Sequence, residues 1–229
     1  MMHLRTAAVV LSGVLLLAGA GRAQEKAEDN EAKRVADATT VFKEIMSAED
    51  KAIPGAILGK AEGIAIFPNT IKAGLGVGGM RGRGIISARN QGAWSAPAFL
   101  TLTGGSFGLQ IGASATDLVL VIQNRRGLEN LVRNQFKIGA DAGVAAGPVG
   151  RDAQASTDIQ LRAEILSYSR SRGLFAGISI NGSTIQQDRD ANQRFYGRAL
   201  TTKQILFEPM VSVPAAVTGW RELLTTRAK

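Results

Sequence analysis

Residues 74–84 read GLGVGGMRGRG, a stretch that holds six glycines and two arginines. Its first six letters fit the G-x-G-x-x-G pattern of a dinucleotide-binding loop. Such a loop needs a helix directly after the glycines and an acidic residue about 20 positions further on. Residues 80–86 are instead interrupted by glycine and then strand-like, and no aspartate or glutamate occurs between Glu62 and Asp117. The sequence therefore does not predict a phosphate-binding loop here.

Packing explains these glycines better than phosphate binding does. Because side chains alternate between the two faces of a strand, Gly74, Gly76 and Gly78 fall on one face of an extended chain. A glycine face permits strong curvature, or the close approach of another backbone or helix. The same spacing recurs at Gly108 and Gly112, at Gly139, Gly143 and Gly147, and at Gly173 and Gly177. We therefore expect a strongly curved antiparallel β-sheet or a small barrel, built from glycine-rich strands.

Hydrophobic periodicity predicts the order of the other elements. Residues 25–50 carry apolar side chains at helical spacing, which indicates an amphipathic helix that either docks on the core or inserts into a membrane. Further helices are expected at residues 54–62, 127–133, 188–196, 203–207 and 217–226. Strands are expected at residues 64–67 (ended by Pro68), 85–88, 93 onward, 107–111, 118–122 (central), 165–168 and 174–180. The fold class is α+β, with an antiparallel sheet flanked by N-terminal and C-terminal helices.

The first 23 residues have the layout of a secretory signal peptide. Arg5 precedes an apolar run over residues 7–17, and small residues lead to Ala23. The apolar run is too short to span a bilayer comfortably, so we expect cleavage after Ala23. The protein is then exported, periplasmic or secreted, and peripheral on a membrane. Residues 24–50 form the expected N-terminal helix, and residues 51–229 form the main domain with its C-terminal helices.

Composition argues against several kinds of chemistry. The chain has no cysteine, and its one histidine, His3, lies in the expected signal peptide. Catalysis by Ser-His-Asp or Cys-His groups and ordinary zinc or haem sites are therefore not expected, and we expect no metal and no cofactor. A carboxylate-dependent hydrolase stays open as an alternative, although its acids have no special spacing. The candidate acids are Asp117, Asp141, Asp152, Asp158 and Glu164.

The chain is basic, with a formal net charge of +8. A basic surface suits anionic partners such as phospholipid head groups, polyanionic glycans or nucleic acid. Nucleic acid is not expected, because the basic residues are scattered and are not interleaved with aromatic residues. A solvated basic surface that has no partner remains the alternative.

Six segments occur in an order that resembles the SYLF domain family, a family of lipid-binding domains. The resemblance covers residues 35–208. The segments are KAEGIAIFP (60–68), GLGVGGMRGRG (74–84), WSAPAFLTLTGGSFGLQIGASATDLVLVI (94–122), FKIGADAGVAAGPVGR (136–151), EILSYSRSRGLFAGISI (164–180) and RFYGR (194–198).

The resemblance implies a non-enzymatic domain that binds anionic phospholipid. Eukaryotic relatives bind phosphoinositides, partly through an N-terminal amphipathic helix, and some also bind actin. Bacterial relatives are exported. Actin binding is not expected for this chain, because an exported protein would not meet actin. The alternative is a structural or assembly protein of the cell envelope that acts through protein–protein contacts.

The resemblance also places candidate lipid-binding residues. Lys60, Lys72, Arg81 and Arg83 lie in or beside the matching segments, where they would contact phosphate oxygens. Trp94 would lie at the lipid interface, which favours amphipathic rings. Apolar insertion would come from the N-terminal helix or from the segment around Trp94.

Overall fold

The computed structural model describes residues 30–48, 52–150, 162–171, 174–178, 180–209 and 213–228, with the backbone alone at 74–77, 106–113 and 174–175. A helix over residues 30–47, the N-terminal helix, comes first. The elements that follow are α2 (Gly55–Gly59), β1 (Gly63–Asn90), β2 (Ala93–Trp94), β3 (Ala98–Ile122), α3 (Arg125–Leu131), β4 (Gln135–Lys137), β5 (Val144–Ala146), β6 (Ile165–Ser171), β7 (Leu174–Gly177), β8 (Thr184–Gln187), α5 (Arg189–Tyr196), α6 (Thr202–Phe207), a 3-10 turn (Ala215–Val217) and α7 (Thr218–Arg227).

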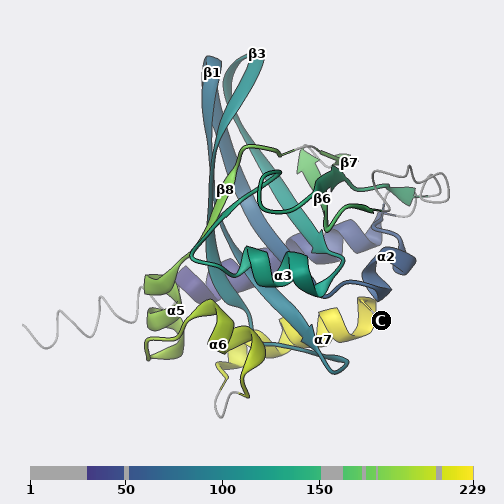
Figure 1. The fold of residues 1–229 in the computed structure, drawn as a ribbon, viewed down its shortest axis with the longest axis vertical. Helices are drawn as coiled ribbons and strands as arrows, with labels where there is room; N and C mark the ends of the chain where they lie inside the picture. Colours follow the sequence, from purple (N-terminus) through teal and green to yellow (C-terminus); the bar gives the residue numbers. More distant parts are fainter. Residues whose placement is uncertain are drawn as a thin grey trace, which may run out of the picture.

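The strands form one strongly curled sheet, flanked by helices from both ends of the chain (Figure 1). Its main path runs β2-β1-β3-β6-β5, while β8 also pairs with β3, β4 pairs with β8, and β7 pairs with β6. The expected α+β class, the strong curvature and the central place of residues 118–122 are confirmed. The sheet is mixed, however, because β5 pairs with β6 in parallel. A three-residue strand carries too little periodicity to indicate this pairing.

Two long strands replace four of the expected short ones. β1 spans 28 residues and β3 spans 25, and they pair from Gly63↔Ile122 to Ile86↔Ala98. Pro68 does not end β1, because it lies where the register shifts between Phe67 and Thr70. A bulge tolerates proline, and Asn69 adopts φ 48° there before the strand resumes.

The ribbon made by β1 and β3 folds back on itself at a second register shift, between Gly74 and Gly76. A Cβ added at Gly82 would lie 2.6 Å from Thr70 Oγ1, and one added at Gly84 would collide with the Phe67 ring. The two arms of β1 therefore pack face to face, and bare backbone makes this approach possible. The packing explanation for the glycines is confirmed at these two positions.

The expectation is wrong for the set at residues 139–147. Gly139 lies in a turn at φ 87°. Gly147 lies against the Tyr168 ring, and Gly177 in turn packs on the backbone of Gly147. These glycines meet different neighbours and do not form one strand face, although their spacing suggests one.

Helices from both ends of the chain pack together on one part of the ribbon. We call this part, around Ile66, Phe67, Ser87 and Phe99, the base. Phe42 of the N-terminal helix is fully buried, and its ring meets Trp220 of α7 edge-on, with ring centroids 5.9 Å apart. Trp220 Nε1 donates a hydrogen bond of 2.8 Å to Ser87 Oγ on β1. Burying one such large side chain contributes about 1.5–3 kcal/mol. Among the described residues, no helix combines the length and the hydrophobicity that crossing a membrane requires.

Candidate functional site

A buried ion-pair network holds the start of the N-terminal helix. Glu31, only 2% exposed, lies 3.1 Å from Arg34 and 2.6 Å from Arg194 of α5. Arg34 also lies 3.0 Å from Asp188, which caps α5. The hydrogen bond that Arg194 donates to the Glu31 carboxylate raises the pKa of Arg194 above its ordinary value. Together with the Phe42 contact, the network fixes the apolar face of this helix on the core. Of the two alternatives for the helix, docking on the core and insertion into a membrane, the structure shows docking.

The candidate residues divide between two places. Lys72, Arg81 and Arg83 lie on the part of β1 that folds back, where Gly82 packs on Thr70. Lys60 follows α2 and is exposed, and Trp94 lies in β2. The structure therefore places the first group on one strand, on either side of residues 74–77, and places Lys60 and Trp94 on other elements.

The three cations of the first group are available to a ligand. Strand alternation buries Met80, Gly82 and Gly84 and leaves Arg81 and Arg83 exposed, while Lys72 is partly exposed. Within the described part of the chain, no hydrogen bond or ion pair involves these three cationic side chains. Residues 63–116 contain no acid, and the one carboxylate of the two strands, Asp117, is paired with Arg170.

Arg83 also borders a shallow hollow of about 300 Å³ beside the N-terminal helix. Lys33 and Arg34 contribute further positive charge to its walls, and Glu31 and Asp37 contribute negative charge. Lys33 is paired with Asp37 at 2.7 Å, and Arg34 is paired as described above. Among the described residues that line this hollow, Arg83 is therefore the cation without an ion-pair partner, and it can contact an anionic ligand.

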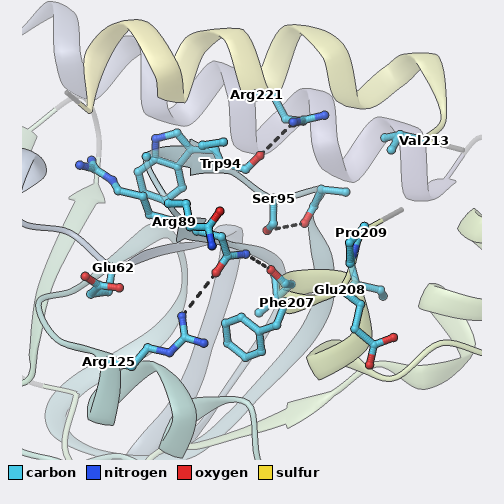
Figure 2. Close-up of a pocket in the computed structure, with 17 residues that line it drawn as sticks. Glu62, Arg89, Trp94, Ser95, Arg125, Phe207, Glu208, Pro209, Val213 and Arg221 are labelled. Carbon is cyan, nitrogen blue, oxygen red and sulfur yellow. Dashed lines mark hydrogen bonds between the residues drawn. The ribbon is translucent and has the colours of Figure 1, made fainter. Parts of the chain in front are cut away.

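A larger pocket of about 690 Å³ lies at the opposite end of the ribbon, and Figure 2 shows its lining. Trp94, 2% exposed, forms one wall, and the Arg89 guanidinium lies 4.9 Å from the Trp94 ring centroid. Arg221 Nε donates a hydrogen bond of 2.9 Å to the Trp94 carbonyl oxygen. These contacts give Trp94 a structural role, and its burial argues against the expected place at a lipid interface.

The opposite wall of this pocket is also built around an arginine. The Arg125 guanidinium lies 4.2 Å from the Phe207 ring centroid, and its Nε lies 3.1 Å from Glu129 Oε1. Asn90 donates a hydrogen bond to the Leu206 carbonyl oxygen and accepts one from Arg125 (Figure 2). No sequence pattern indicates the three arginines of this pocket, because only the fold brings residues 89, 125 and 221 together.

The acids suggested for a hydrolase are engaged in separate interactions. Asp117 lies 2.6 Å from Arg170 and accepts a hydrogen bond from Asn69 N, and burial raises the pKa of its carboxyl group. Asp141 accepts a hydrogen bond from Lys137 N, and Glu164 lies 3.4 Å from Arg126. Asp152 and Asp158 lie outside the described residues. In the described part of the chain, no three His, Cys, Asp or Glu side chains gather as metal ligands would.

A family model described as "Ysc84: Las17-binding protein actin regulator" matches residues 103–227. The chain belongs to this family. The match confirms the resemblance to SYLF domains. The family's description names a binding partner and a regulatory role, so the coarse class is that of binding proteins. The same description does not support the expectation that this chain does not bind actin.

Three relatives illustrate the similarity. The chain is 35% identical over 201 residues to "SH3 domain-containing YSC84-like protein 1" of Rattus norvegicus. The aligned region covers 86% of this chain and 58% of that protein. It is 34% identical over 207 residues to "Protein YSC84" of Saccharomyces cerevisiae, covering 89% and 44%. It is 36% identical over 183 residues to "LAS seventeen-binding protein 3" of the same species, covering 78% and 39%. The chain thus spans about half the length of these relatives.

Proposed function

We propose that this chain binds anionic phospholipid surfaces, outside the cytoplasm and without catalysing a reaction. The observation that carries the proposal is the group of three unpaired cations, Lys72, Arg81 and Arg83, on a ribbon whose one acid, Asp117, is paired with Arg170. Each such cation near a charged membrane surface contributes up to about 1 kcal/mol. Arginine also donates two parallel hydrogen bonds to phosphate oxygens, which adds geometric fit to the charge.

The structure supports binding without rearrangement of the protein. The N-terminal helix stays docked through Glu31 and Phe42, so the exposed cations act from a rigid ribbon. Attraction of this kind is screened by salt, because the Debye length falls from about 10 Å at 0.1 M to about 3 Å at 1 M ionic strength. Binding should therefore be strong at low salt and weak at high salt.

Co-sedimentation with vesicles tests the proposal. The chain from residue 24 onward contains every described residue and is mixed with phosphatidylcholine vesicles, with or without phosphatidylglycerol. We expect binding to the anionic vesicles alone, and loss of that binding in the double variant Arg81→Glu plus Arg83→Glu.

Arg133→Glu plus Arg198→Glu is the matched control, because both residues are exposed and the change in net charge is the same. The proposal fails if the Arg81 and Arg83 variant binds as well as the unaltered chain. It also fails if the control variant loses as much binding, since the attraction would then have no location on the ribbon.

A protein partner at the larger pocket is the second candidate function. Three arginines, Trp94 and Phe207 line that pocket, and the family is described by a protein partner. The chain would then act as an assembly protein through protein–protein contacts. Self-association measured by light scattering in the absence of lipid would favour this candidate, if Arg125→Ala abolishes it and Arg81→Glu plus Arg83→Glu does not.

A further inference from the structure

The turning end of the ribbon is unlike the rest of the protein surface. We call residues 71–79 of β1 and 105–115 of β3 the apex. Ile71 lies at the start of the apex and is 56% exposed, and among the described residues it is the one large hydrophobic side chain that is exposed. Its neighbour Ala73 and its cross-strand partner Ala115 are exposed as well.

The apex pairs with no other part of the described sheet. β3 pairs with β8 over Leu100–Thr103 and with β6 over Asp117–Ile122, which lie on either side of the apex. β1 pairs with β2 only at Arg89 and Asn90. Within the described residues, the apex strands therefore pair only with each other, and Figure 1 shows them projecting beyond the helices and the shorter strands.

The sequence of the apex is apolar and nearly free of charge. Its segments read IKAGLGVGG and GSFGLQIGASA, in which Lys72 is the only charged residue. Exposed strand edges in soluble proteins usually carry charges, because charges prevent edge-to-edge association. A projecting ribbon whose sequence is apolar apart from Lys72 therefore indicates a surface that is covered in the functional state.

The charges around the apex indicate what covers it. Lys72 lies near the start of the apex segment of β1, and Arg81 and Arg83 follow that segment, so positive charge flanks residues 73–79 along β1. This order matches an anionic bilayer, in which phosphate groups lie outside the hydrocarbon region. A second copy of this chain would instead bring like charges together.

We propose that the apex inserts into the interfacial region of an anionic membrane while the three cations contact phosphates. This inference rests on the proposed phospholipid binding and adds the element and the orientation. Insertion is shallow, because the outer edges of a two-stranded ribbon leave backbone groups unpaired and cannot enter hydrocarbon. The N-terminal helix and Trp94 stay in the protein, in contrast to the expectation that one of them inserts.

Site-specific labelling tests the inference directly, because the chain has no cysteine of its own. An environment-sensitive fluorophore is attached at Ala73→Cys or Ala115→Cys in the apex. The controls are Ala36→Cys on the outer side of the N-terminal helix and Ala216→Cys beside α7, where the alanines are also exposed. Each labelled chain is titrated with phosphatidylglycerol-containing vesicles, and vesicle binding is measured in parallel.

We expect a severalfold rise and a blue shift of emission at residues 73 and 115, quenched by shallow spin-labelled lipids, and no change at residues 36 and 216. Vesicle binding without a change at residues 73 and 115 would overturn insertion and leave phospholipid binding intact. An equal change at residue 36 would overturn insertion of the apex and would indicate that the N-terminal helix contacts the membrane. A change that depends on protein concentration without lipid would overturn it in favour of self-association. Absence of vesicle binding would reject the proposed function itself.

Discussion

The base and the apex belong to the same two strands but have opposite surroundings. At the base, bulky residues such as Ile66, Phe67 and Phe99 are fully buried between the folded arms of the ribbon and the helices. At the apex, glycines are frequent, and within the described residues the two strands pair only with each other. The difference teaches that one ribbon can contribute to the core at its ends and project from it in its middle, which is the part that we propose contacts a membrane.

The largest expected effect is at the base, where Phe42→Ala removes the contact between the N-terminal helix and Trp220. Large-to-small changes of buried aromatic residues lower the free energy of unfolding by about 3–5 kcal/mol. Urea denaturation followed by circular dichroism measures this loss. A small loss would show that the helix is only loosely docked, and the base would then differ less from the apex in how tightly it is packed.

A pair of glycine variants compares base and apex directly. Gly84→Val would force a side chain into the Phe67 ring, whereas a Cβ added at Gly79 meets nothing within 4 Å. Overpacking of this kind typically lowers the free energy of unfolding by about 1–3 kcal/mol. We expect a clear drop in the melting temperature for Gly84→Val and little change for Gly79→Val. Equal effects would contradict the folded-back arrangement of β1.

Neutralisation of charge beside the apex should weaken membrane binding without weakening the fold. Arg81→Gln plus Arg83→Gln removes up to about 2 kcal/mol of attraction at low salt, because each cation contributes up to about 1 kcal/mol. Vesicle titration at two salt concentrations measures the effect, and the melting temperature serves as the control. If binding falls only in proportion to a loss of folded protein, the cations have no direct role.

The smallest expected effect concerns Ile71. Ile71→Ser should reduce the binding that persists at high salt by about 1 kcal/mol, a part of the 1.5–3 kcal/mol that complete burial of such a side chain provides. The control is Thr103→Ser, which changes an exposed residue of a strand. Ile57→Ser in α2 would be less suitable, because Ile57 packs against the core. Unchanged high-salt binding in Ile71→Ser would remove the apolar contribution from the account.

Local patterns in the sequence predicted much of this fold. Helical spacing located the N-terminal helix and the C-terminal helices, and continuous apolar residues identified the central strand at 118–122. The extent of β1 and β3 could not be predicted, because Pro68 and the glycines at 74–79 normally end a strand. Here tertiary packing of Gly82 on Thr70 and of Gly84 on Phe67 keeps the chain extended through both interruptions.

The candidate lipid-binding residues stay a prediction, and the structure shows only how accessible each of them is. Arg81 and Arg83 are exposed, Lys72 is partly exposed, and none of the three is paired within the described residues; their contact with lipid stays a prediction. Trp94 was a poor candidate, because its aromatic character does not reveal that Arg89 and Arg221 hold it in a pocket wall. The isolation of the apex depends on which strands pair with which, and local sequence patterns carry little of that information.

Hydrogen–deuterium exchange of the unmodified chain, with and without anionic vesicles, tests the division of roles most directly. The account predicts that vesicles slow exchange in peptides covering residues 71–83 and 104–116, and leave residues 30–47 and 213–228 unchanged. Slower exchange in the N-terminal helix or around the larger pocket, with no change at the apex, would contradict it.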